Sequence, residues 1–346
     1  MKSLRRATIK KHTEKHAGYF REAFDREKDL KTEEISAEES NEAFANYLVN
    51  KINKSSELSK LYGAYRPPVL SPAQFEILTR NGKPYMLGEG DYARVILAQK
   101  VGSQELVAIK ISRNDEGEEG DEEDEKAFEK DMLREMGRFL KAQDAIVSDG
   151  YPVALHGFMR IKDDSPLACH NYKLMPVIGV ASLTPNDPVS MSLQQAFDMM
   201  KKDSVALFTP EIWADIILQL LRCVRSIYNA GVRHNDLHAG NILISMLDEQ
   251  IKLSIIDYGS SSNVNHSHYC PHQDLYELMT LFMDPMLECV PFRRTKDYVG
   301  QIKRHKTKSF RLTKFKDQKD SYNKIHFDDV IAKLECTLQK DLESFR

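Results

Sequence analysis

The fold is decided by the stretch His234-Asn235-Asp236-Leu237-His238-Ala239-Gly240-Asn241-Ile242-Leu243, followed by Asp257-Tyr258-Gly259. An Asp followed five residues later by an Asn and an apolar strand, and sixteen residues after that by a second Asp, is a specific pattern. Phosphoryl transfer needs these groups: one oxygen that orients a hydroxyl and takes its proton, and two oxygen ligands for Mg²⁺. We therefore expect Asp236, Asn241 and Asp257 to surround one small space.

A glycine-rich turn and a lysine-bearing strand lie upstream, in the order that nucleotide binding requires. Gly88 and Gly90 stand between apolar stretches, and Val107-Ala108-Ile109-Lys110 follows them. Two strands joined by such a turn let backbone N–H groups approach phosphate oxygens without interference from a Cβ. An alternating strand then carries Lys110 to the same phosphates. Alone, the two glycines would indicate an ordinary hairpin, so the prediction depends on the combination.

Together these motifs resemble those of the protein kinase superfamily, over about residues 80 to 285. The resemblance implies an α+β fold of two lobes, with a β-rich N-lobe and a mainly helical C-lobe. It also implies a catalytic base at Asp236, metal ligands at Asn241 and Asp257, and Lys110 as the group that holds the α- and β-phosphates. ATP is the implied phosphate donor, with Mg²⁺, or Mn²⁺ in its place, as the metal cofactor.

The resemblance further implies where the nucleotide binds. Tyr172–Gly179 is similar to the strand and hinge that join the lobes, with Met175 at the back of the adenine pocket. Backbone groups of Pro176 to Ile178 would then meet the adenine edge. The full implied set of nucleotide-binding residues is Gly88, Gly90, Val95, Ala108, Lys110, Met175, Val177 and Ile178.

A kinase also needs a Glu on an N-lobe helix that holds the lysine by charge pairing. Two candidates, Glu129 and Glu135, lie in Lys126–Leu140, which the apolar spacing predicts to be a helix. The apolar residues of one face are Met132, Met136, Phe139 and Leu140. Glu135 adjoins this stripe and is the favoured partner of Lys110. For either Glu, the alternative is a solvated surface carboxylate.

The chain departs from the kinase pattern at positions that bear on regulation. Ala93 stands where a third loop glycine is usual, and Asn235 replaces the Arg that commonly precedes the catalytic Asp. In many kinases that Arg pairs with a phosphate on the activation loop, so such switching loses its cation partner here. Asp274 follows Asp257 by only seventeen residues, and Gln273–Leu278 resembles the start of a C-lobe helix. The activation segment is therefore short, and so is the usual platform for peptide substrates.

These features leave three functions open. The first is an atypical serine/threonine-protein kinase, acting on Ser or Thr before Tyr in a protein substrate. Short activation segments also occur in bacterial effector kinases and in kinases of large DNA viruses, so that substrate could be a host protein. The second is a small-molecule kinase of the aminoglycoside or choline type, which His238 and Gly240 favour. The third is a non-catalytic binding module, the weakest because every reactive position is filled.

Composition agrees with an intracellular enzyme. The chain has 346 residues, a length sufficient for two lobes, and a net charge of only −3. Its five Cys include no C-x-x-C pair, which favours a reducing compartment. We see no run of eighteen apolar residues and no apolar segment typical of a secretory signal. We expect a cytoplasmic or intracellular location, including delivery into a host cell or expression from a viral genome.

Three domains are expected: an N-terminal helical extension (1–78), a kinase N-lobe (79–178) and a helical C-lobe (179–346). Within the N-lobe, residues 115–125 carry nine acids and read as a disordered or solvated insert, with a docking site for a basic partner as the alternative. Within the C-lobe, residues 293–319 carry eleven Lys or Arg. That segment is either a solvated helical face or a site for an anionic ligand such as acidic lipid, inositol polyphosphate or nucleic acid.

Apolar spacing predicts three further helices. In the extension, Phe44, Tyr47, Leu48 and Ile52 recur at helical spacing and indicate a helix packed on the N-lobe. Thr209-Pro210-Glu211 is a helix start, and the residues of its expected core face are Ile212, Ile216, Leu220, Cys223, Val224 and Ile227. Phe327 to Phe345 is predicted to be a terminal amphipathic helix that covers the C-lobe.

Overall fold

The computed structural model describes two compact units of the chain. The described residues are 31–34, 42–89, 93–103, 105–112, 122–159, 175–179, 191–203, 208–247, 250–264, 273–279, 287, 292–312 and 327–345. Those of the first unit, here the β-rich unit, fall within 31–141 and 153–180. Those of the second, here the helical unit, fall within 142–152 and 181–346. The predicted fold class is confirmed: the N-terminal part is rich in β-sheet and the C-terminal part is mainly helical.

The β-rich unit is built on a nine-stranded sheet with the order β1-β3-β6-β7-β9-β8-β2, in which β4 pairs with β3 and β5 with β6. The strands are β1 (Lys31–Glu34), β2 (Val69–Leu70), β3 (Phe75–Arg80), β4 (Lys83–Pro84), β5 (Met86–Glu89), β6 (Ala93–Lys100), β7 (Leu106–Ser112), β8 (Leu155–Met159) and β9 (Met175–Gly179). All described pairs are antiparallel except β2 with β8.

Strand alternation divides the side chains of this sheet into two faces. One face forms an apolar core that consists of Phe75, Ile77, Ile96, Ala98, Val107, Ile109, Ile111, Met159 and Val177. Because successive side chains of a strand point to opposite faces, Ala108 and Lys110 of β7 lie on the other side. The sheet core thus fixes the face on which Lys110 is presented.

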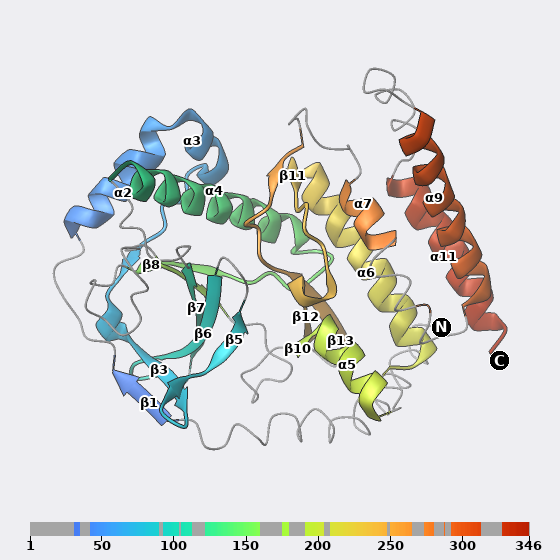
Figure 1. Ribbon diagram of the computed structural model, residues 1–346, viewed down its shortest axis with the longest axis horizontal. Helices are drawn as coiled ribbons and strands as arrows, with labels where there is room; N and C mark the ends of the chain where they lie inside the picture. The colour runs from blue at the N-terminus through green and yellow to red at the C-terminus, as the bar shows by residue number, and fades with distance from the viewer. Residues whose placement is uncertain are drawn as a thin grey trace. The chain divides into compact units, whose positions relative to one another are not determined.

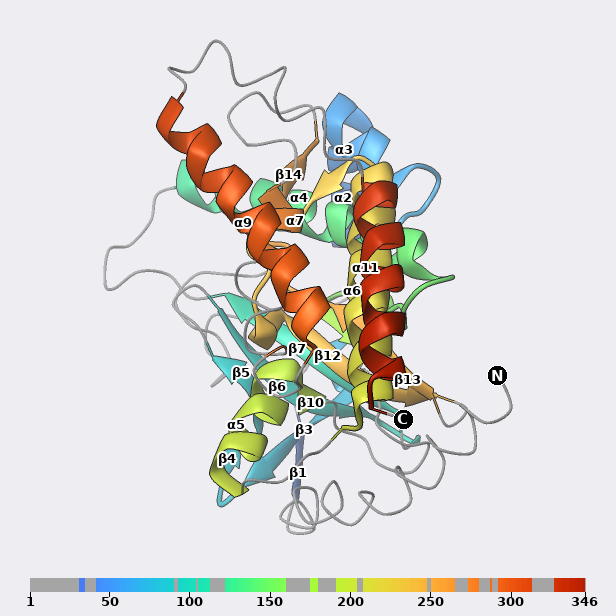
Figure 2. The ribbon, with the colours of Figure 1, turned by 90° about the vertical axis from the view of Figure 1, so that its right-hand side faces the viewer.

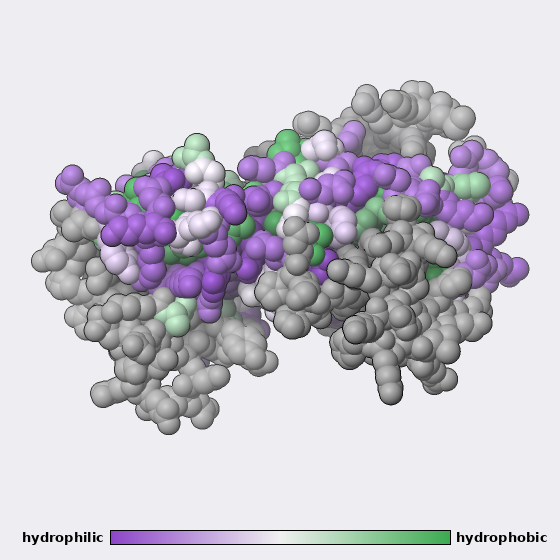
Figure 3. Space-filling view, turned by 90° about the horizontal axis from the view of Figure 1, so that it is seen from above, coloured by the Kyte–Doolittle hydropathy of each residue, from purple (hydrophilic) through white to green (hydrophobic). Residues whose placement is uncertain are grey.

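Three helices complete the β-rich unit: α2 (Glu42–Lys54), α3 (Ser56–Tyr62) and α4 (Glu122–Ile146), of which residues up to Lys141 belong to this unit. They lie together on one side of the sheet (Figure 1). The predicted N-terminal amphipathic helix is confirmed as α2, with Leu48 and Ile52 buried and Tyr47 exposed. Seen from the side of these helices, their outer surface is mostly hydrophilic (Figure 3).

Helix α4 begins earlier than the apolar stripe predicted. Residues 122–125, expected to belong to a disordered insert, form its first turn, while 113–121 lie outside the described residues. The correction has a physical reason: acidic side chains near a helix N-terminus are stabilised by the helix dipole. The run of acidic residues therefore did not show where α4 begins.

The helical unit contains five helices among its described residues: α5 (Leu193–Asp203), α6 (Pro210–Asn229), α7 (Gln273–Glu277), α9 (Arg293–Leu312) and α11 (Phe327–Glu343). A three-stranded sheet joins β10 (Met191–Ser192), β12 (Ile242–Leu247) and β13 (Gln250–Ile255). A two-stranded sheet joins β11 (Val232–Arg233) and β14 (Ser262–Asn263). These short strands carry the loops described below.

Helix α6 is the central helix of this unit. The Thr209 side chain caps its first turn by accepting a hydrogen bond from the N–H of Ile212 at 3.3 Å, as the cap–Pro–acid start predicted. Every residue of the predicted core face is buried. Helix α11 packs beside α6, and Arg225 pairs across the two helices with Asp328 at 2.6 Å (Figure 2).

The ends of α9 and α11 refine two predictions. The terminal helix ends at Glu343, short of its predicted end at Phe345. Phe345 is 42% exposed, although its ring lies 6.0 Å from that of Phe292. The basic segment begins as α9, whereas 313–319 lie outside the described residues.

No helix in the described part of the chain is long and apolar enough to cross a membrane.

Candidate active site

The loop 234–241 follows β11, and its first residue is a buried histidine that fixes the loop. His234 is 1% exposed, and its ring lies 4.8 Å from that of Tyr258. Its Nε2 bonds the carbonyl of Ile256 at 2.8 Å, and its Nδ1 accepts from the N–H of Asp236 at 3.3 Å. His234 therefore ties the loop to the segment that carries Asp257.

Two acids of α7 anchor the same loop through its backbone. The carboxylate of Asp274 accepts from the N–H groups of His234 and Asn235, each at 2.8 Å, and Glu277 accepts from the N–H of Leu237 at 3.1 Å. Burial raises the pKa of Asp274, while these backbone donors and Arg233 oppose the rise. The sequence identified this segment only as a helix start. Two acids three residues apart among apolar residues were the available signal for their role.

Asp236 and Asn241 lie together at the two ends of this loop. The Asn241 side-chain amide donates to the backbone carbonyl of Asp236 at 3.0 Å, and lies 3.5 Å from its carboxylate. Because the amide nitrogen is used in this way, the carboxamide oxygen is directed elsewhere. Asp236 itself is exposed, with His238 Nε2 3.8 Å from its carboxylate. The loop thus presents an accessible carboxylate on a rigid frame.

Asp257 follows β13 in a left-handed backbone conformation with φ of 62°. Non-glycine residues seldom adopt this conformation, although Asp tolerates it. The preceding residue is fixed, since the N–H of Ile256 donates to the carbonyl of Asn241 at 3.0 Å. This hydrogen bond brings the backbone just before Asp257 next to that of Asn241.

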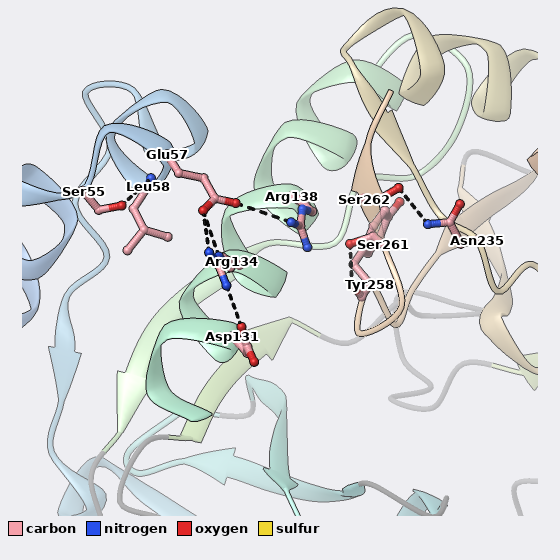
Figure 4. A network of polar contacts seen from close by, with 10 residues as sticks. All are labelled: Ser55, Glu57, Leu58, Asp131, Arg134, Arg138, Asn235, Tyr258, Ser261 and Ser262. Atoms are coloured by element: carbon pink, nitrogen blue, oxygen red, sulfur yellow. Dashed lines mark hydrogen bonds and ion pairs between the residues drawn. The ribbon is translucent and has the colours of Figure 1, made fainter. Parts of the chain in front are cut away.

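The Asn235 side chain holds the segment after Asp257 by hydrogen bonds. Its side-chain amide donates to the carbonyl of Ser260 at 3.0 Å and to the hydroxyl of Ser262 at 2.9 Å. Figure 4 shows this contact beside the hydrogen bond from Ser261 to the carbonyl of Tyr258. The chain thus holds this segment with an uncharged amide.

In the β-rich unit, Lys110 and Glu135 form a buried ion pair. The distance from Lys110 Nζ to Glu135 Oε1 is 2.5 Å, and both residues are 8% exposed. The alternative candidate, Glu129, instead pairs with Lys51 at 2.8 Å and accepts from the Tyr47 hydroxyl at 2.9 Å. The favoured choice of Glu135 agrees with this geometry, and its catalytic role stays a prediction.

The other nucleotide-binding candidates divide between the two faces of the sheet. Val95 is the cross-strand partner of Lys110, and Ile178 is the partner of Ala108, so these four residues share one face. Val177 pairs with Ile109 and lies in the opposite, apolar core. Its side chain therefore does not share the face of Lys110.

The strand pairing of β9 also bears on the backbone contacts that we expected at the hinge. Val177 and Ile178 of β9 pair with β7 on one side and with β8 on the other. A backbone flanked by strands on both sides has its hydrogen-bonding groups engaged in the sheet. These strand pairings therefore occupy backbone groups of Val177 and Ile178 that we expected to meet the adenine edge. The side chain of Met175, the expected back wall of the adenine pocket, lies outside the described part of the structure.

Gly88 lies in the irregular pairing of β5 with β6, opposite Val95. A Cβ added there would meet no atom within 4 Å, so packing does not require the glycine. Gly90, the second predicted loop glycine, lies outside the described residues.

The donor set of the helical unit fits a hard divalent cation. Asn241 offers a carboxamide oxygen and Asp257 a carboxylate, and oxygen ligands of this kind suit Mg²⁺ or Mn²⁺. Among the described residues, no cluster of three or more His, Cys, Asp or Glu forms a self-contained metal site.

The buried His234 predicts a pH dependence of stability. Burial lowers its pKa below the ordinary 6.5, against the opposing effects of Ile256 and nearby carboxylates. As the pH falls below 6.5, the unfolded chain takes up a proton on His234 that the folded protein excludes. The free energy of unfolding therefore decreases by up to about 1.4 kcal/mol per pH unit. Thermal midpoints in EDTA should fall more between about pH 7.5 and about pH 5.5 for wild type than for His234→Gln. Equal falls would refute this assignment.

Comparison with known families finds a similarity in the helical unit. The family described as the protein kinase domain matches residues 189–286. The matched range includes the loop 234–241, Asp257 and α7, and it excludes the β-rich unit with Lys110 and Glu135.

Proposed function

Since the chain is a member of the protein kinase superfamily, we propose that it transfers the γ-phosphate of ATP to a Ser or Thr hydroxyl of a protein substrate. The observation that carries this proposal lies in the matched range. There an exposed Asp236 is held beside Asn241, on a loop anchored by buried hydrogen bonds. This is the arrangement needed to orient a hydroxyl and accept its proton.

In this proposal each side chain has one task. Asp236 orients the attacking hydroxyl and takes its proton late in the transfer. Lys110, held by Glu135, binds the α- and β-phosphates, with Val95, Ala108 and Ile178 on the same face of the sheet. Asn241 and Asp257 would hold Mg²⁺ or Mn²⁺, which neutralises charge on the phosphates when bound.

A small-molecule acceptor is the second candidate, since it was favoured by His238 and Gly240. The structure supplies another reason for this pair of residues. The His238 ring accepts from the N–H of Gly240 at 3.1 Å, and a Cβ on Gly240 would lie 2.9 Å from the ring. The His238 ring leaves no room for a side chain at position 240. The two residues therefore do not by themselves indicate a small acceptor. A protein acceptor is therefore preferred.

Label transfer separates the candidates. Purified chain is incubated with γ-labelled ATP, alone and with a cell lysate, in Mg²⁺, in Mn²⁺ and in EDTA. We expect metal-dependent label on protein, at phosphoserine or phosphothreonine. Label confined to small molecules would replace the protein kinase assignment with the second candidate. No label in any fraction would indicate a non-catalytic module.

Further expectations from the sequence stay proposals. An anionic ligand at 293–319, a host protein as substrate, and an intracellular location belong to this group, as do the domain limits 1–78, 79–178 and 179–346. In α9, Val299 and Ile302 are buried while Arg293 and Lys296 are exposed. This pattern fits both a solvated helical face and a basic contact surface.

A further inference from the structure

Helix α3 is a short but well-defined element of the β-rich unit. The Ser55 hydroxyl caps it by accepting from the N–H of Leu58 at 3.2 Å, and Gly63 ends it with a positive φ of 55°. Leu58, Leu61 and Tyr62 are buried. Hydrogen bonds thus fix both ends of α3, and its buried face packs against another helix.

That partner is α4, the helix that carries Glu135. Gly137 of α4 allows the close approach, since a Cβ there would lie 2.8 Å from Leu61 Cβ and 3.0 Å from the Tyr62 ring. The Tyr62 hydroxyl donates to the backbone carbonyl of Leu133 at 2.8 Å in a buried position. Contact therefore occurs on both sides of Glu135 along α4.

Charged side chains add a second set of contacts between the same helices. Glu57 of α3 accepts from Arg134 at 2.8 and 2.9 Å, and Arg138 lies 3.6 Å from its other oxygen (Figure 4). One turn earlier, Lys51 of α2 pairs with Glu129 at 2.8 Å. Several successive turns of α4 are thus tied to α2 and α3.

We propose that α2 and α3 form a built-in positioning element that holds α4 in the register at which Glu135 pairs with Lys110. Tyr62 and Glu57 are then positioning residues, which act through Glu135 and touch no substrate. The proposal rests on the proposed function only for its effect on the reaction. Its role would be to keep the lysine in place without an added subunit or a phosphorylation step.

The physical reason is the cost of burying an ion pair. The charges of Lys110 and Glu135 lose most of their hydration, and their attraction offsets that cost only when the geometry is good. A shift of α4 along or away from the sheet would lengthen the 2.5 Å contact and leave two poorly paired charges. Contacts that fix α4 on its other side therefore favour the paired state.

The test uses full-length chain and two readouts. One is the rate at which an amine-reactive acylating reagent modifies Lys110, measured by mass spectrometry of the digested protein. The other is kcat and KM for ATP in label transfer. The variants are Tyr62→Phe, Glu57→Arg, Glu57→Arg with Arg134→Glu, and Glu135→Gln. Lys60→Ala, at an exposed position of α3, is the matched control.

We expect Lys110 acylation to rise about five- to tenfold in Glu57→Arg and in Glu135→Gln. It should return toward the wild-type rate in the charge swap and stay unchanged in Lys60→Ala. The value of kcat/KM should fall by a similar factor in Glu57→Arg. When Glu135 is already Gln, Glu57→Arg should lower kcat/KM by a further factor of about two or less. Both substitutions act through the Lys110–Glu135 pair.

Two outcomes would overturn the proposal. The first is unchanged Lys110 acylation in both Tyr62→Phe and Glu57→Arg while Glu135→Gln raises it. The second is an undiminished effect of Glu57→Arg on acylation when Glu135 is already Gln. If acylation follows the expected pattern but no variant, including wild type, transfers label, the proposed function fails while the positioning role stands.

Discussion

Replacement of Asp236 by Asn is expected to lower kcat by about 10²–10⁴-fold, the usual contribution of a positioned general base. The amide has the same shape as the carboxylate but cannot accept the proton of the attacking hydroxyl. The fold should survive, because Asp236 is exposed and Asn241 donates to its backbone carbonyl, which the substitution keeps. ATP binding should change little, since Asp236 acts on the acceptor.

A matched variant makes this prediction specific. Asp198→Asn changes an exposed Asp in α5 of the same unit and should leave kcat unaltered. The measurement is the initial rate of label transfer at saturating ATP, with thermal midpoints as the check on folding. A kcat for Asp236→Asn within a few-fold of wild type would remove Asp236 from the role of base.

Replacement of Asp274 by Ala should have the second-largest effect, on both stability and transfer. Its carboxylate is 3% exposed and accepts from two successive backbone N–H groups. Loss of these acceptors leaves both donors buried, at a cost of about 1–3 kcal/mol each. Because those donors belong to His234 and Asn235, the loop before Asp236 should lose its fixed geometry and kcat should fall well beyond any loss of folded protein.

Asp341→Ala is the control that separates the two effects. Asp341 is also 3% exposed and accepts from the N–H groups of Arg294 and Thr295, but it joins α11 to α9. Denaturant unfolding should show comparable destabilisation of both variants. Below the unfolding range, only Asp274→Ala should have a reduced kcat. Equal kcat values in the two folded variants would show that α7 does not support catalysis.

The parts of the site that depend on local sequence were predictable. Strand alternation predicted a strand that presents Lys110, and the apolar stripe of α4 favoured Glu135 over Glu129. Both inferences use a periodicity within one element, and the Lys110–Glu135 contact agrees with them. The core face of α6 followed from the same kind of pattern.

The parts that depend on contacts far apart in sequence were missed. The hydrogen bonds from His234 and Asn235 to Asp274 join residues about forty positions apart, and no periodicity reports them. The pairing of the expected hinge strand was missed for a related reason. A single strand does not reveal that β9 has neighbours on both sides, and this sheet order arises only on folding. The docking of α3 on α4 likewise depends on Gly137, which reads locally as an unfavourable helix residue.

The proposed kinase activity requires both Lys110 and Asp236. The most direct measurement compares label transfer from γ-labelled ATP by wild type, Lys110→Met, Asp236→Asn and Asp198→Asn under single-turnover conditions. The account predicts metal-dependent labelling by wild type and Asp198→Asn, and its loss in the other two variants. Wild-type labelling by folded Lys110→Met and Asp236→Asn would contradict it.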